Sequence, residues 1–388
     1  MEKTLTYYDI IICGGGLSGL SLAYTAFKTG IWKYEKVLIL EKNNTDRTWS
    51  FWQKSTSPFE EIINHKWTKL VFYNNHGKRT ELNHSPYTYN TIKGEDFYSF
   101  IHTFLNQLPQ VNIVNDVVTK IMTRKGQCTV QAEKEVYTSK FAFSSIYHKP
   151  HLHSKQQYFL QHFKGIRIKT SDVNFNPNEA LLMDFRTTQE NGTTFFYTLP
   201  MNKNEVFVEY TLFSKMLLPS EQYDKKINIY LKEVLGIKSF EILETEFGVI
   251  PMTDYKFQRH KDNLTYIGTA GGDTRGSTGY TFSNVQKTIA KILETYKKTG
   301  SPIGFEETIG EKESLYDATL LRVLDEGKYE GHQLFTDLFE NTKASSIFSF
   351  LDGESALFND FKIMKSLKTW PFLKSFIKAC SSRLHANK

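Results

Sequence analysis

Apolar and polar positions near the beginning of the chain follow the pattern of a strand, a helix and a second strand. Residues 8–13 form a short run rich in β-branched side chains, which is typical of a buried parallel strand. Apolar residues then recur at helical spacing from Leu17 to Phe27, and Gly30 follows as a helix stop. A second apolar run, residues 37–40, ends on Glu41. The pattern predicts a strand–helix–strand unit.

The rest of the chain changes its period several times. Residues 97–108 carry apolar side chains at helical spacing, which predicts a helix with a core-facing stripe. Residues 111–121 and 127–143 predict short strands that return the chain to the first unit, and residues 163–213 predict an antiparallel meander with many aromatic rings. Beyond residue 300 the pattern is helical, with breaks at Gly310, Gly327 and Gly353. These segments indicate an α/β chain with a separate β region and a helical C-terminal part.

Glycines occupy the first turn in a pattern that has a known physical use. Gly14, Gly16 and Gly19 satisfy G-x-G-x-x-G between a strand and a helix, and Glu41 follows 22 positions after Gly19. Such glycines permit a tight turn, close approach of a pyrophosphate, and close packing of helix on strand, while the acid is placed to bind a ribose hydroxyl. We favour an FAD or NAD site over an ordinary glycine-rich turn because all the parts occur together.

A second glycine-rich turn distinguishes between these two cofactors. An apolar run at residues 263–267 leads into Gly268, Gly271 and Gly272, and Gly279 precedes another predicted helix. A second strand, turn and helix N-terminus far from the first is the layout that a flavin needs, whereas NAD sites usually need only the first. The sequence therefore favours FAD.

Composition and charge narrow the class of protein. The 388 residues carry a formal net charge of +6 without a concentrated basic stripe, so nucleic acid is not an expected partner. The three cysteines are far apart and show no disulfide or metal spacing. His148, His151 and His153 lack an obvious partner ligand, so we expect solvated histidines and no metal site. With no apolar run of 18 residues and no room for a signal peptide before residue 8, we expect a cytoplasmic-side protein.

Two aromatic segments are candidates for a site. Residues 49–52 bring together Trp49, Phe51 and Trp52, which form either a hydrophobic plug or the wall of a cavity. In residues 206–213, alternation places Glu209 on one face with Phe207 and Phe213. Its carboxyl is either at a solvated edge, which composition alone favours, or buried with a raised pKa, where it would act as an acid near neutral pH.

With these segments in hand, the chain resembles the bacterial lycopene cyclase family of flavoproteins. The specific matches are Arg47-Thr48-Trp49-Ser50-Phe51-Trp52 and Phe207-Val208-Glu209-x-Thr211. Weaker matches are the first glycine turn, Met183-Asp184-Phe185-Arg186, Tyr197-x-Leu199-Pro200, Gly248-x-Ile250-Pro251, Gly271-Gly272 and Thr278-Gly279-Tyr280. In two places the chain departs from related patterns. Tyr210 stands where the plant-type motif has a second acid, and Gly268-Thr269 stands where flavin monooxygenases have Gly-Asp, which puts a flavin contact by Asp273 in doubt.

The resemblance implies an architecture and its domain boundaries. It implies a Rossmann-type, glutathione-reductase-like FAD domain formed by residues 1–45, 91–150 and 246–300. An inserted antiparallel β-sheet domain for the substrate would comprise residues 46–90 and 151–245, and residues 301–388 would be C-terminal helices.

The resemblance also implies a reaction, in which the ψ end groups of lycopene are isomerised to β-ionone rings, toward β-carotene, without net redox change. Glu209 would be the acid/base, working with reduced FAD and with NADPH or NADH as reductant. Substrate contacts would come from Trp49, Phe51, Trp52, Tyr197 and Phe207. Cofactor contacts would come from Gly14, Gly16, Gly19, Glu41, Arg47, Gly268, Gly271, Gly272 and Gly279.

Two other classes of protein remain compatible with the sequence. A redox flavoenzyme of the same fold, such as a polyprenyl (geranylgeranyl) reductase or an aromatic hydroxylase, would consume reductant stoichiometrically. A non-enzymatic carotenoid or flavin carrier would bind pigment and convert nothing.

The C-terminal segment raises the question of how the chain meets a carotene dissolved in a bilayer. Residues 361–388 contain seven lysines and arginines and no acid, with apolar residues including Trp370 at roughly helical spacing. Such a segment either lies in the headgroup region of an anionic membrane or packs its apolar stripe on the protein. We expect peripheral association with the inner face of the cytoplasmic membrane.

Overall fold

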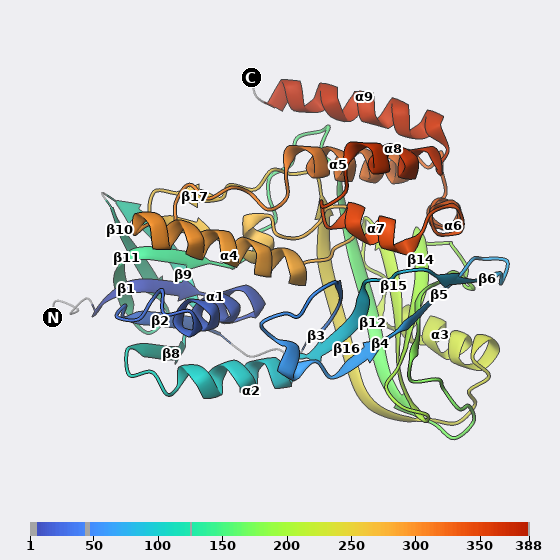
Figure 1. Cartoon of the computed structure of the whole chain (residues 1–388), viewed down its shortest axis with the longest axis horizontal. Helices are drawn as coiled ribbons and strands as arrows, with labels where there is room; N and C mark the ends of the chain where they lie inside the picture. Colours follow the sequence, from blue (N-terminus) through green and yellow to red (C-terminus); the bar gives the residue numbers. More distant parts are fainter. Residues whose placement is uncertain (1–5, 43–46, 125, 387–388) are drawn as a thin grey trace.

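The computed structural model describes residues 6–42, 47–124 and 126–386, and three β-sheets organise them (Figure 1). An eight-stranded sheet with helices α1, α2 and α4 forms one side of the molecule. A seven-stranded sheet forms the other side, and the C-terminal helices lie across its upper part. A three-stranded sheet lies where these two parts meet.

The eight-stranded sheet contains the predicted strand–helix–strand unit. Its order is β17-β18-β11-β1-β2-β8, with β9 and β10 added through β11, and β18, β11, β1, β2 and β8 pair in parallel. The strands are β1 (Thr6–Cys13), β2 (Val37–Glu41), β8 (Val111–Asn115), β9 (Val118–Arg124), β10 (Gln127–Ala132), β11 (Val136–Ser144), β17 (His260–Lys261) and β18 (Leu264–Tyr266).

The central strands of this sheet are buried on both faces, which explains their continuous apolar sequence. Ile10 and Ile12 of β1 face a core formed with α1 (Leu17–Lys28), α2 (Gly94–Leu105) and α4 (Phe282–Thr299). Ile11 and Cys13 face the opposite core, which is covered by side chains of β10 and β11. The chain leaves this sheet after β2, returns at β8, leaves again after β11 and returns at β17.

The seven-stranded sheet has the order β16-β12-β15-β14-β13-β5-β6. Its β13, β14 and β15 form the predicted antiparallel meander, but β13 pairs with β5 in parallel, so the sheet is mixed and the expectation of a purely antiparallel sheet is wrong. A parallel neighbour needs a long connection, and sequence spacing does not reveal it. The strands are β5 (Lys69–Tyr73), β6 (Arg79–Leu82), β12 (Tyr158–Lys169), β13 (Glu179–Asp184), β14 (Thr193–Pro200), β15 (Glu205–Ser214) and β16 (Glu241–Thr253).

Each face of the seven-stranded sheet is covered differently. Val206, Val208 and Tyr210 of β15 pack on one face with α3 (Ser220–Ile229) and the π-helical turn η2 (Tyr230–Val234). Phe207 and Phe213 face the opposite core, which is shared with the C-terminal helices. Because β16 belongs to this sheet, the expected domain boundary at residue 246 falls inside one of its strands.

Short elements and helices complete the fold. The three-stranded sheet and the 3₁₀ turns are β3 (Thr48–Gln53), β4 (His65–Trp67), β7 (Thr88–Lys93), η1 (Glu60–Ile62) and η3 (Gly268–Gly271). The C-terminal helices are α5 (Glu311–Asp325), α6 (Gly331–Asn341), α7 (Ala344–Leu351), α8 (Leu357–Lys365) and α9 (Thr369–Ala386). Among the described residues no helix has the length and hydropathy needed to cross a bilayer.

Candidate active site

A cavity of about 680 Å³ runs from the first glycine turn to the seven-stranded sheet. Gly14 and Gly16 line one end, and Glu209 of β15 lines the other. Between them the walls come from Trp49 of β3 and from the second glycine turn at Gly268 and Gly279. Residues that are far apart in sequence are therefore brought to a single space.

The first glycine turn has the geometry that its sequence predicts. Gly14 has φ of +108°, which favours glycine, and a Cβ on Gly19 would lie 2.0 Å from the carbonyl oxygen of Gly14. A Cβ on Gly16 would instead meet nothing within 4 Å, although Gly16 lines the cavity. Gly16 caps α1 without a side-chain hydrogen bond. The helix N-terminus thus offers backbone N–H groups and a backbone surface that a phosphate can approach closely.

Glu41 and Arg47 lie at the same end of the cavity. Glu41 ends β2, and its Oε2 accepts a hydrogen bond of 2.5 Å from the backbone N–H of Gly15. Arg47 is exposed at the cavity rim. The carboxylate therefore lies beside the glycine turn, where a ribose hydroxyl would be expected, and the rim carries a cation suited to a phosphate.

The second glycine turn divides into residues that line the cavity and residues that shape the turn. Gly268 and Gly279 line it, and both have positive φ. Gly271 and Gly272 are not among the lining residues, and a Cβ on Gly271 would lie 2.3 Å from the carbonyl oxygen of Tyr266. The structure therefore places Gly271 and Gly272 behind the cavity wall.

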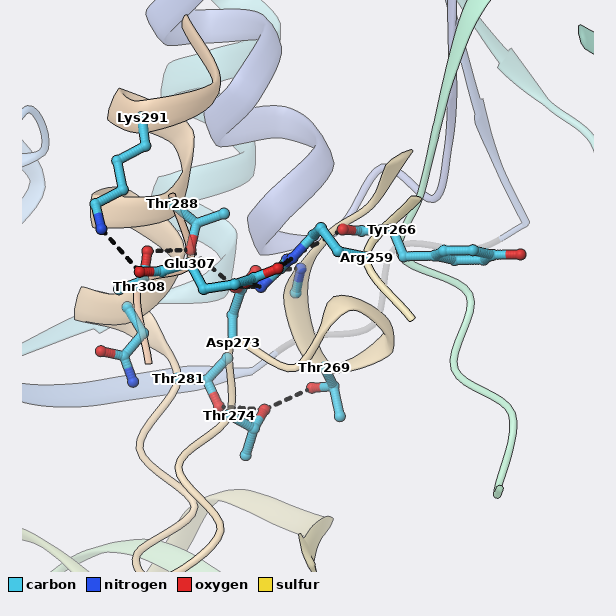
Figure 2. Close-up of polar contacts among 12 residues, drawn as sticks. Arg259, Tyr266, Thr269, Asp273, Thr274, Thr281, Thr288, Lys291, Glu307 and Thr308 are labelled. Carbon is cyan, nitrogen blue, oxygen red and sulfur yellow. Dashed lines mark hydrogen bonds and ion pairs between the residues drawn. The ribbon is translucent and has the colours of Figure 1, made fainter. Parts of the chain in front are cut away.

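Asp273 organises this turn from behind (Figure 2). Its carboxylate accepts hydrogen bonds from the backbone N–H of Gly268 (2.7 Å), from Thr288 Oγ1 (2.8 Å) and from Arg259 (2.9 Å). Arg259 also pairs with Glu307 at 2.8 Å. Only 1% of Asp273 is exposed, and it does not line the cavity.

Glu209 lies at the other end of the cavity, on a central strand between β12 and β14. The solvated edge that composition favours is therefore wrong. Its Oε1 accepts a hydrogen bond of 2.6 Å from Thr211 Oγ1. Burial raises the pKa of the Glu209 carboxyl to about 8, the Thr211 bond acts to lower that pKa, and Glu246 adds a smaller upward shift. Near neutral pH this side chain can hold and release a proton.

Three tyrosines surround this carboxyl. Tyr197 of β14 pairs directly with Glu209 across the strands, and Tyr89 and Tyr280 line the same cavity. The hydroxyl oxygens of Tyr89 and Tyr280 lie 3.4 Å apart. Burial raises the pKa of all three phenols, so they remain neutral. The sequence reasoning overlooked Tyr89 and Tyr280, although Tyr280 follows the glycine of a quoted motif.

The tryptophan-rich segment is distributed over three environments. Trp49 lines the cavity. Phe51 is buried in the core, where its ring stacks on Phe282 at 4.1 Å. Trp52 faces away, stacks on Phe348 at 4.6 Å and lines a second cavity. The segment is thus both plug and wall, and Phe51 belongs to the plug.

Two features of the seven-stranded sheet support this end of the cavity. Gly165 of β12 pairs with Glu209 on one side and with Glu246 of β16 on the other. The ring of Phe207 covers Gly165, since a Cβ there would lie 2.3 Å from Phe207 Cζ. Glu246, which the sequence reasoning also overlooked, accepts a hydrogen bond of 3.3 Å from the backbone N–H of Thr48. Only the strand register reveals that both carboxyls share one face.

No group of three metal-ligating side chains occurs in the described part of the chain. The residues present do fit a dinucleotide cofactor, because the open surface at Gly16 and the N-terminus of α1 face the cavity.

Comparison with known proteins agrees with this arrangement. The chain is 27% identical over 308 residues to a chloroplastic neoxanthin synthase of Solanum tuberosum, and 23% identical over 295 residues to a chloroplastic lycopene beta cyclase of Solanum lycopersicum. Each match covers 70% of this chain and 57% of the relative, so the chain spans little more than half the length of these proteins. A flavoprotein/dehydrogenase structure from Cytophaga hutchinsonii shares the fold, with a TM-score of 0.62, 14% identity and coverage of 95% and 98%.

The family comparison covers nearly the whole chain. The model of the family described as Lycopene cyclase protein matches residues 9–376, which include both glycine turns, Glu209 and most of the C-terminal helices. The chain belongs to the lycopene cyclase protein family.

Proposed function

We propose that this protein cyclises the ψ end groups of lycopene to β-ionone rings, with Glu209 as general acid and base. The observation that carries the proposal is a carboxyl with a pKa near 8 inside an aromatic cavity of a lycopene cyclase family member. At neutral pH most of this carboxyl is protonated, and an alkene can be protonated only by such an acid held close to it.

The proton balance of the reaction needs no other residue. Glu209 gives its proton to the terminal double bond, and a tertiary carbocation forms. The neighbouring double bond attacks this cation and closes the ring. The Glu209 carboxylate then takes a proton from the ring, which restores both the double bond and the acid. Substrate and product are isomers, so electrons and protons balance.

The cavity walls suit a carbocation. Tyr89, Tyr197 and Tyr280 present neutral aromatic rings, whose faces stabilise a nearby positive charge. Phe207 and Trp49 add apolar wall that excludes water, which would otherwise capture the cation. Thr211 holds the Glu209 carboxyl in position.

FAD is the cofactor that we propose for the other end of the cavity. The pyrophosphate would be held at Gly14, Gly16 and the N-terminus of α1, and the ribose by Glu41. When bound in its reduced form, with NADPH or NADH as reductant, FAD supplies negative charge that stabilises the cation electrostatically. The similarity of the fold to that of the Cytophaga hutchinsonii flavoprotein supports this choice. We further propose that the seven-stranded sheet forms an inserted substrate domain.

One incubation with FAD, NADPH and lycopene tests the proposed reaction against its rivals. Cyclised product without net loss of NADPH is the expected result. Product formed with stoichiometric NADPH consumption would indicate a redox flavoenzyme. Bound pigment without any product would indicate a carrier.

A graded pair of variants tests the cofactor site. Gly16→Ala and Gly16→Val add side chains where the structure has open cavity, so folding should be preserved while FAD affinity falls slightly for alanine and is lost for valine. Flavin absorbance of the purified proteins measures this. A yellow Gly16→Val protein with full flavin content would refute the assignment.

Membrane association, on the inner face of the cytoplasmic membrane, is the second part of the proposal. The C-terminal helices combine both alternatives that the sequence leaves open: Ile363 and Ala379 are buried, whereas Trp370 and Ile377 are 75% and 60% exposed. Lysines lie beside them, a combination typical of helices at anionic lipid surfaces.

Point variants test it better than a deletion, because part of α8 and α9 is packed. Trp370→Ser with Ile377→Ser should weaken sedimentation with anionic vesicles, and high salt should act in the same direction. Binding unchanged by both treatments would contradict the proposal.

A further inference from the structure

A second cavity, of about 450 Å³, lies between the seven-stranded sheet and the C-terminal helices. Its volume is within the range of small-molecule sites. Apolar and aromatic side chains form most of its wall. Representative lining residues, one from each of six elements, are Met183, Phe195, Leu338, Phe348, Met364 and Phe372. We call this cavity the apolar chamber.

The apolar chamber adjoins the cavity of Glu209. Tyr197, Thr278 and Tyr280 line both spaces. The ring of Tyr280 packs on Trp52, with centroids 4.2 Å apart, and its hydroxyl lies near that of Tyr89. The two cavities are therefore adjacent, with Tyr280 at their common boundary.

The other end of the apolar chamber reaches the surface at α8 and α9. Phe361 and Leu373 line the chamber and are nevertheless 56% and 46% exposed. Trp370 and Ile377, which are exposed without lining the chamber, extend the same apolar surface. The chamber thus connects the exposed apolar part of the C-terminal helices with the site of the acid.

The lining offers little to a polar ligand. Asp317 is its one carboxylate among the described residues, and Arg275, the backbone N–H of Gly276 and Ser277 already donate hydrogen bonds to its oxygens. Lys365 lies at the exposed rim, over the ring of Phe361. A ligand without polar groups fits such a wall, because burying an unpaired polar group is costly.

We propose that the apolar chamber binds the unreacted length of a linear polyene, which enters between α8 and α9 while its end group reaches Glu209. For the identity of the substrate this inference rests on the proposed function. The cavity of Glu209 must also hold the cofactor, so the remainder of a long substrate needs a space of its own. The chamber, which meets the cavity of Glu209 at Tyr280, provides that space.

Filling the chamber tests the proposal. Met364 lines the chamber, is half-buried and does not belong to the core beneath it, so Met364→Trp should fill the space without disturbing the fold. Leu338→Phe is a milder second filling from α6. Met122→Trp is a matched control on β9, at a 41% exposed side chain that lines neither cavity. Flavin content and the thermal midpoint of each variant establish that it is folded.

Binding of lycopene is measured by its absorption shift, and turnover is measured with lycopene and with a shortened analogue that keeps the ψ end group. Met364→Trp should weaken lycopene binding about tenfold or more, because the filled chamber cannot accept the chain. The shortened analogue should react as in the parent protein, and Met122→Trp should change neither lycopene binding nor turnover.

The outcomes separate this inference from the proposed function. Unchanged lycopene binding in both folded filling variants would overturn the chamber assignment, even if the parent protein cyclises lycopene. A different outcome is that the parent protein binds lycopene without cyclising it, and that the filling variants bind it more weakly. This would support the chamber and refute the proposed reaction. Displacement of bound lycopene by an equal concentration of a long-chain fatty acid would assign the chamber to lipid chains instead.

Discussion

The carboxyls of Asp273 and Glu209 are both desolvated, but they differ in the groups that surround them. Asp273 lies behind the second glycine turn with a guanidinium, a hydroxyl and a backbone N–H directed at its oxygens. Glu209 faces a cavity with one hydroxyl donor, Thr211, and no salt bridge to it is formed within residues 6–42, 47–124 and 126–386. Burial raises the pKa of both, but only at Asp273 does a neighbouring cation oppose it.

This difference in surroundings shows that burial of a carboxyl has a different consequence in each region. A carboxylate that is paired with arginine and fully enclosed stabilises a turn. A carboxyl that is desolvated without a cation, and that opens to a cavity, exchanges its proton near neutral pH. If this comparison is right, substitutions in the two regions should affect different measured quantities.

The largest effect is expected at Glu209. Glu209→Gln keeps the shape of the side chain but removes the transferable proton, so turnover should fall by about 10²–10⁴. Flavin content and the thermal midpoint should remain close to those of the parent protein. Steady-state product formation measures the loss.

Glu205→Gln is the matched control, since Glu205 begins the same strand and does not line the cavity. It should leave turnover unchanged. Near-normal turnover of Glu209→Gln would move the acid elsewhere. Asp184, from the Met183-Asp184-Phe185-Arg186 match, would be the next candidate. It is fully buried and hydrogen-bonded by Arg186 and Tyr230, so its surroundings resemble those of Asp273.

The second effect should appear in stability rather than in chemistry. Asp273→Asn leaves Arg259 buried with only Glu307 as a charged partner, so the free energy of unfolding should fall by about 3 kcal/mol. Glu306→Gln, at a 90% exposed side chain nearby, should change it by less than about 0.5 kcal/mol. Denaturant titration measures both. Equal stability of the two variants would remove the distinction between the two regions.

The sequence predicts those features of the two regions that depend on neighbouring residues in the chain. The alternation of β15 correctly places Glu209 with Phe207 and Phe213. In the first glycine turn, the positive φ of Gly14 and the close backbone contact at Gly19 are local constraints, whereas Gly16 lies open to the cavity. Helix stops at glycines also hold beyond residue 300, where Gly310, Gly327 and Gly353 separate helices.

What could not be predicted depends on pairing between distant segments. Composition favoured a solvated Glu209, but its strand lies between β12 and β14 and its side chain lines the cavity, where it is desolvated. The parallel pairing of β5 with β13 and the alignment of Glu209, Gly165 and Glu246 are matters of register, which local alternation does not determine. The apolar stripe of residues 361–388 could not be divided into packed and exposed positions without knowing which helices lie beside it.

A smaller effect should come from the single donor to Glu209. The Thr211 hydroxyl acts to lower the pKa of this carboxyl, so Thr211→Val should raise it further above 8. In the proposed mechanism the protonated form is the active one, so activity should be present below the pKa and lost as pH rises through it. The alkaline limb of kcat/KM, expected near pH 8 in the parent protein, should move upward by about one pH unit. A limb that moves downward would contradict the assigned role of Thr211.

The smallest effect should come from Glu246. It lies two strands away from Glu209, across Gly165, which corresponds to about 10 Å between backbones. Its negative charge makes ionisation of Glu209 harder, so Glu246→Gln should lower the pKa of Glu209 and move the alkaline limb to lower pH by a few tenths of a unit. Glu244→Gln is the control, because Glu244 is already paired with Arg167 and should leave the limb in place. Opposite shifts from Thr211→Val and Glu246→Gln would identify the titrating group as Glu209, since a distant group would respond to neither.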